Sequence, residues 1–74
     1  MIEVVYLENN KAVEIPVRDV REGVRKAKRL SIIHGGTVLE RWHEKGYRMW
    51  HRYFNDGKES KQGITVHRPG EQTR

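Results

Sequence analysis

Residues 2–17 of the chain read IEVVYLENNKAVEIPV, two alternating apolar runs on either side of Asn9-Asn10. Side chains of a β-strand alternate between its two faces, and asparagine tolerates the positive φ that a two-residue hairpin turn requires. A turn at Asn9-Asn10 places six apolar residues on one face of a hairpin: Ile2, Val4, Tyr6, Val13, Ile15 and Val17. Pro16 has no backbone N–H to donate, which favours an edge strand or a strand end for the second run. The sequence therefore predicts an N-terminal β-hairpin with one face in the core.

A helix is predicted directly after this hairpin. Asp19 can cap it, and Glu22, three residues later, completes a capping box. At about 100° per residue, four residues share a narrow stripe that we expect to face the sheet: Val20, Val24, Ala27 and Ser31. Gly23 costs about 1 kcal/mol relative to alanine inside a helix, and we expect it to allow a close approach to the sheet. Because Ile32 and Ile33 leave the stripe, the helix is expected to fray near Ser31.

Three more strands are predicted after Gly35-Gly36, over residues 37–44, residues 47–55 and a segment that includes Ile64, Thr65 and Val66. The turns are expected at Lys45-Gly46 and Asp56-Gly57. With two-residue turns, Arg41 lies opposite Trp50, His43 opposite Arg48, Met49 opposite Ile64 and Tyr47 opposite Val66. The order β-β-α-β-β-β predicts a small single α+β domain over residues 1–67, with a mostly antiparallel sheet and one amphipathic helix on one face. Residues 68–74 are expected to be a disordered tail.

Composition narrows the class of protein. A chain of 74 residues has room for one small domain, and it contains no cysteine. A disulfide framework, a thiolate zinc site and a cysteine nucleophile are therefore excluded. No apolar run approaches the length of a membrane span, and residues 1–5 carry an acid where a signal peptide has basic residues. We expect a soluble, cytoplasmic protein with no membrane partner.

The net charge of +5 is unevenly distributed. Residues 1–19 carry two basic and four acidic side chains, whereas residues 20–37 carry five basic side chains and one acidic side chain. Such asymmetry favours an anionic partner, although many basic surfaces only promote solubility.

Basic and aromatic residues interleave between Arg41 and Phe54. Strand alternation is expected to place Arg48, Trp50 and Arg52 together on the face away from the helix. Guanidinium groups neutralise phosphates, and an exposed indole stacks on unpaired bases. The expected nucleic-acid-binding residues of this face are Arg41, His43, Arg48, Trp50 and Arg52. Two alternatives remain: an ordinary solvent face on which arginine pairs with tryptophan, and an inverted strand in which Trp50 and Phe54 turn inward.

The helix offers a second basic surface, opposite its apolar stripe. Its residues are Arg21, Arg25, Lys28 and Arg29. Phosphate contacts there would position a nucleic acid without reading its sequence, whereas the alternative is a solvated helix face. The two basic surfaces are expected on opposite sides of the domain.

Nothing in the sequence demands catalysis. The four histidines, His34, His43, His51 and His67, have no recognised metal-ligand spacing, and we expect no metal and no cofactor. A metal-independent RNase needs only residue types such as His43 or His51 with Arg48 and Tyr47, but no spacing calls for it. We therefore expect a non-enzymatic protein.

The leading hypothesis is a small basic domain that binds nucleic acid, either DNA or RNA. The alternative is a small protein-binding regulator or inhibitor that uses the aromatic-rich hairpin as its interface, because Trp, Tyr and Arg are favoured at interface hot spots. The order hairpin, helix, strand through Trp42 resembles that of small phage-encoded inhibitors of bacterial RNA polymerase. This resemblance covers about half of the chain and includes no diagnostic motif. Either hypothesis leaves room for a homo-oligomer.

Overall fold

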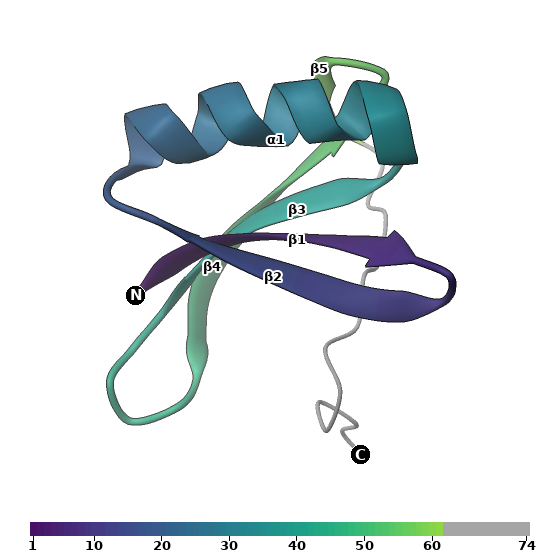
Figure 1. The fold of residues 1–74 in the computed structure, drawn as a ribbon. Coiled ribbons are helices and arrows are strands. Elements are labelled where there is room, and N and C mark those ends of the chain that lie inside the picture. Colours follow the sequence, from purple (N-terminus) through teal and green to yellow (C-terminus); the bar gives the residue numbers. More distant parts are fainter. Residues whose placement is uncertain (62–74) are drawn as a thin grey trace.

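The computed structural model describes residues 1–61 of the chain. Within them, five antiparallel strands form one sheet in the order β2-β1-β3-β4-β5, and one helix covers a face of it (Figure 1). The elements are β1 (Ile2–Glu8), β2 (Lys11–Val17), α1 (Val20–His34), β3 (Thr37–Trp42), β4 (Arg48–Asn55) and β5 (Lys58–Ser60). The predicted α+β class and the order β-β-α-β-β-β are confirmed. No helix among the described residues is long and apolar enough to span a membrane.

The N-terminal hairpin has the predicted register. Val4 pairs with Ile15 and Tyr6 with Val13, and Asn9 and Asn10 have φ values of 54° and 64°. Positive φ at both central residues characterises the turn whose twist matches that of the flanking strands. The turn chemistry and the apolar alternation therefore select the same pairing.

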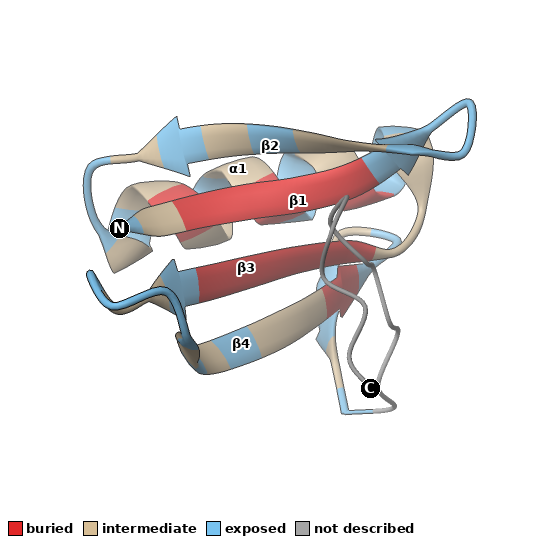
Figure 2. Ribbon diagram, turned by 90° about the horizontal axis from the view of Figure 1, so that it is seen from below, coloured by how far each residue is buried: buried red, intermediate tan, exposed pale blue. Residues whose placement is uncertain are grey.

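The core lies between α1 and the sheet. Its fully buried residues are Val4, Ala27, Leu39 and Phe54, against which Ile2, Val17, Val20, Val24, Leu30 and Trp50 pack. Figure 2 shows the buried runs along β1 and β3, two of the three inner strands of the sheet. A second buried cluster, Val5 and Val38 with Ala12 and Tyr53, belongs to the other face of the sheet.

Helix α1 begins as predicted and ends later than predicted. The Asp19 side chain accepts a hydrogen bond from the Glu22 N–H (2.8 Å), whereas the Glu22 carboxylate accepts from the N–H of Arg18, one residue before the cap (2.8 Å). The expectation that the helix frays near Ser31 is wrong, since it continues to His34. Ser31 is buried, and its hydroxyl accepts the Gly57 N–H (2.8 Å) while its carbonyl accepts the Asp56 N–H (3.3 Å). The β4–β5 turn thus anchors the end of the helix.

The β3–β4 connection differs from the predicted two-residue turn. His43 N–H donates to the Tyr47 carbonyl (2.8 Å) and Gly46 N–H to the His43 carbonyl (2.9 Å), while Gly46 has a φ of 96°. These bonds enclose a three-residue loop of the kind that ends in a left-handed glycine. His43 therefore lies opposite Tyr47, and its predicted pairing with Arg48 is wrong. Strand β3 ends at Trp42 and strand β4 begins at Arg48. Both strands therefore lie within the predicted ranges, residues 37–44 and residues 47–55.

The β4–β5 turn has the predicted two residues, because Asn55 pairs with Lys58 across Asp56-Gly57. Strand β5 extends over Lys58–Ser60. The predicted strand around Ile64–Val66, its pairing with β4, the domain end at residue 67 and the tail over residues 68–74 all lie outside the described residues.

Candidate nucleic-acid interface

The side chains of Trp50 and Arg52 in strand β4 lie on the opposite face of the sheet from the one predicted. Trp50 packs against the core cluster under α1, and Phe54 on the same side is fully buried. The register places Trp50 opposite Arg41 and Arg52 opposite the buried Leu39. The prediction that Trp50 and Arg52 face away from the helix is therefore wrong. Burying Phe54 removes a large aromatic surface from water, and regular alternation then brings Trp50 and Arg52 to the same side.

Arg48 lies apart from Trp50 and Arg52. The β3–β4 register shifts between Arg41 and Trp42, so that Trp42 pairs with Arg48 while Arg41 pairs with Trp50. A bulge of this kind places two residues of one strand opposite one residue of its partner and breaks the alternation. Arg48 is consequently directed to the Glu40 side of the sheet, which is the predicted face away from the helix. Because Trp50 and Arg52 lie on the helix side, the predicted Arg48, Trp50 and Arg52 face does not form.

Arg48 and Arg52 both neutralise acids of the same domain. Arg48 Nη1 lies 3.3 Å from Glu40 Oε1, and this buried carboxylate also accepts a bond from Trp42 Nε1 (2.6 Å). Arg52 binds Glu59 through two hydrogen bonds, from Nε to Oε2 (3.0 Å) and from Nη2 to Oε1 (2.8 Å). These bonds from Arg52 lower the pKa of Glu59, and they raise the pKa of Arg52. Ion pairs within the domain therefore account for the positions of both arginine side chains.

The other two residues predicted for this face, Arg41 and His43, lie near the β3–β4 loop. Arg41 is exposed and lies opposite Trp50, as predicted. The His43 ring stacks on Tyr47, with ring centroids 4.6 Å apart and planes 8° from parallel. His43 Nδ1 also accepts the Lys45 N–H (3.1 Å). The five predicted hairpin residues are therefore divided between two faces and a loop.

The described histidines do not assemble into a metal site. His34 stacks on Tyr6 with ring centroids 4.1 Å apart, and His51 makes an edge contact with Tyr53. In residues 1–61, no group of three histidine or carboxylate side chains is arranged to hold a metal ion.

The second predicted surface, on α1, keeps its expected position. Its four cations, Arg21, Arg25, Lys28 and Arg29, are all exposed, whereas the buried residues of the helix are Gly23, Ala27 and Ser31. None of the four forms an ion pair with another described residue. From Arg21 to Arg29 the helix rises by about 12 Å, so the four charges extend over that length. We call these four residues the α1 cationic surface.

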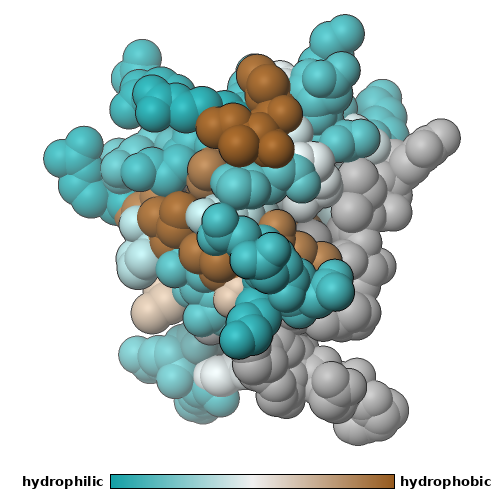
Figure 3. Space-filling view, turned by 45° about the vertical axis from the view of Figure 1, so that its right-hand side comes forward, coloured by the Kyte–Doolittle hydropathy of each residue, from teal (hydrophilic) through white to brown (hydrophobic). Residues whose placement is uncertain are grey.

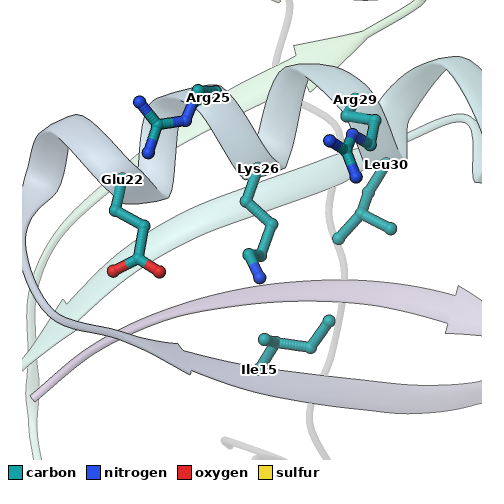
Figure 4. Close-up of a pocket in the computed structure, with 6 residues that line it drawn as sticks. All are labelled: Ile15, Glu22, Arg25, Lys26, Arg29 and Leu30. Carbon is teal, nitrogen blue, oxygen red and sulfur yellow. The ribbon is translucent and has the colours of Figure 1, made fainter.

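A groove runs beside this surface, between α1 and β2 (Figure 4). Ile15 of β2 and Leu30 of α1 are its apolar lining, and the charged lining consists of Glu22, Arg25, Lys26 and Arg29. In Figure 4 the side chains of Lys26 and Leu30 extend from the helix toward Ile15. The groove has a volume of about 300 Å³.

The sequence prediction missed Lys26 and the apolar lining of the groove. At about 100° per residue Lys26 falls at the edge of the charged arc of the helix, and the apolar alternation of residues 11–17 places Ile15 in the core. A signal was present, because Ile15 belongs to the strand with the proline, which predicts an edge. An edge strand has less to cover it, so its core-facing side chains are the ones a groove can expose.

Comparison with known proteins returns nothing for this chain. No family model matches it, and neither the curated proteins nor the solved structures include a significant match. The geometry of the described residues therefore carries the functional argument.

Proposed function

We propose that this protein is a non-enzymatic nucleic-acid-binding domain that holds phosphates on the α1 cationic surface. The observation that supports the proposal is a difference between two sets of cations. Arg48 and Arg52 neutralise Glu40 and Glu59, whereas the α1 cationic surface is exposed and makes no ion pair within residues 1–61. Unpaired exposed cations are the groups that can release counterions from a nucleic-acid backbone.

The shape of the surface is compatible with this role. The charges lie along one helix and extend over about 12 Å, a length over which one strand of a duplex carries about three to four phosphates, at about 3.4 Å per phosphate along the axis. Contacts to phosphate position a nucleic acid without reading its sequence. We therefore expect binding with little sequence preference and a strong dependence on salt.

The test is a titration with short duplex and single-stranded oligonucleotides, followed by fluorescence anisotropy at several salt concentrations. The test variant combines Arg21→Gln, Arg25→Gln and Arg29→Gln. The slope of log affinity against log salt should fall by about 0.7–0.9 for each phosphate contact that is lost.

The matched control combines Lys11→Gln, Lys45→Gln and Lys58→Gln, three exposed cations outside α1. It removes the same formal charge, so equal losses in both triple variants would show that only net charge matters. Absence of binding by the unaltered protein at low salt, where phosphate attraction is least screened, would contradict the proposal.

A protein-binding regulator is the second candidate, and one observation favours it. Ile32 and Ile33 are 64% and 65% exposed at the end of α1, and Figure 3 shows apolar side chains gathered on the side of the molecule where this end comes forward. Neighbouring exposed apolar residues are typical of contact surfaces. This candidate becomes the better one if the oligonucleotides do not bind at low salt.

A further inference from the structure

We propose that the groove between α1 and β2 seats one unpaired nucleotide, so that the protein prefers single-stranded to duplex nucleic acid. This inference rests on the proposed function and specifies its ligand. The groove adjoins the α1 cationic surface, because Arg25 and Arg29 belong to both. A strand whose phosphates lie on the helix can therefore reach the groove without leaving the surface.

The groove exists because α1 and β2 diverge. The helix comes close to the sheet at Gly23, where an added Cβ would lie 3.2 Å from Val17 Cγ2 of β2. Two residues earlier on the same face of β2, Ile15 lines the groove, and the gap opens there (Figure 4). Strand β2 is the sheet edge beyond β1, and sheet twist carries an edge strand away from a straight helix.

The lining suits the two parts of a nucleotide. Ile15 and Leu30 provide an apolar surface for the flat face of a base, and Arg25, Lys26 and Arg29 provide cations for its phosphate. The one acid of the lining, Glu22, already accepts the Arg18 N–H and lies 3.5 Å from Arg18 Nε. The three cations of the lining also outnumber this one acid, so the groove remains attractive to an anion.

Size and access explain the preference for single strands. The volume of about 300 Å³ lies at the lower end of the range for small-ligand sites, about 300–1,000 Å³. Bases in a duplex are stacked and paired, so a duplex offers only its phosphates to the outer cations. Single strands expose bases that can be splayed out into a protein groove.

The experiment compares the affinity for a single strand with that for a duplex of equal length and salt. Ile15→Phe fills the groove without changing charge. Lys26→Gln removes a groove cation, and Arg21→Gln is its matched control outside the groove. The unaltered protein should bind the single strand about fivefold or more tightly, the lower end of what one stacked base contributes. Ile15→Phe and Lys26→Gln should reduce this ratio toward one, whereas Arg21→Gln should weaken both ligands equally.

The outcomes separate this inference from the proposed function. Tight binding of both ligands with a ratio of single-strand to duplex affinity near one would overturn the proposed nucleotide site in the groove. An equal response of this ratio to Lys26→Gln and Arg21→Gln would do the same. Either result would leave the proposal for the α1 cationic surface intact. No binding of either ligand at low salt would overturn both. Because Lys26→Gln alters only a surface charge, the test remains decisive even if Ile15→Phe does not fold.

Discussion

Gly23 is a residue at which the helix approaches the sheet closely. A Cβ built on it would overlap Leu39 Cδ1, and Leu39 is fully buried. Alanine would gain about 1 kcal/mol of helix propensity, but overpacking a core costs about 1–3 kcal/mol. We therefore expect Gly23→Ala to lower the free energy of unfolding in urea denaturation. The double variant with Leu39→Val, which shortens the opposing side chain, should lose less stability than the sum of the two single variants. Additive losses would show that the contact is not tight.

Two carboxylates link stability to pH. The Arg18 N–H lowers the pKa of Glu22 below 4.5, and the hydrogen bonds from Arg52 lower the pKa of Glu59 below 4.5. A carboxylate whose pKa is lower in the folded state stabilises the fold above its unfolded pKa, and this contribution is lost as the pH falls through the folded value. Thermal unfolding should therefore occur at a lower temperature once the pH drops below about 4.5. Glu59→Gln should flatten this acid dependence, and an unchanged profile would contradict the role of the pair.

At the scale of elements, the start of α1 depends on Asp19. Its carboxylate accepts the Glu22 N–H (2.8 Å), which would otherwise lack a partner in the first turn of the helix. Asp19→Ala should cost about 0.5–2 kcal/mol in the free energy of unfolding. Asp19→Asn retains the accepting oxygen and should cost clearly less. Equal losses in the two variants would mean that the charge, rather than the hydrogen bond, stabilises this end.

The elements also show what the sequence could predict. The first hairpin and the start of α1 follow from local chemistry, namely Asn9-Asn10 and Asp19, and these predictions are confirmed. The end of α1 depends instead on bonds from the β4–β5 turn to Ser31, which no local pattern reveals. Likewise, the bulge between Arg41 and Trp42 depends on how two strands meet, and it separates Arg48 from Trp50 and Arg52, which lie on the helix side of the sheet. The helix surface was easier to predict because 3.6-residue periodicity is set within one element.

Across the whole molecule, the basic residues have two different roles. Arg48 lies against Glu40, a carboxylate that is 1% exposed, so it stabilises a buried acid on the Glu40 side of the sheet. The α1 cationic surface is exposed on the other side of the domain and makes no ion pair within the described part of the chain. The net charge of +5 therefore overstates the charge that can attract an anionic partner, because only part of the positive charge is available for binding.

This division predicts that stability and binding respond to different arginines. Arg48→Ala removes one hydrogen-bonded partner of the buried Glu40, and the free energy of unfolding should fall by about 1–3 kcal/mol. For the Arg48→Ala variant, the slope of log affinity for the oligonucleotide against log salt should stay unchanged at a temperature where the variant is folded. Arg25→Ala should do the reverse, with a stability change within about 0.5 kcal/mol and a slope lower by about 0.7–0.9. Urea denaturation and anisotropy titration on the same preparations measure the two effects. A lower slope in Arg48→Ala with no loss of stability would place the binding surface on the sheet instead of the helix.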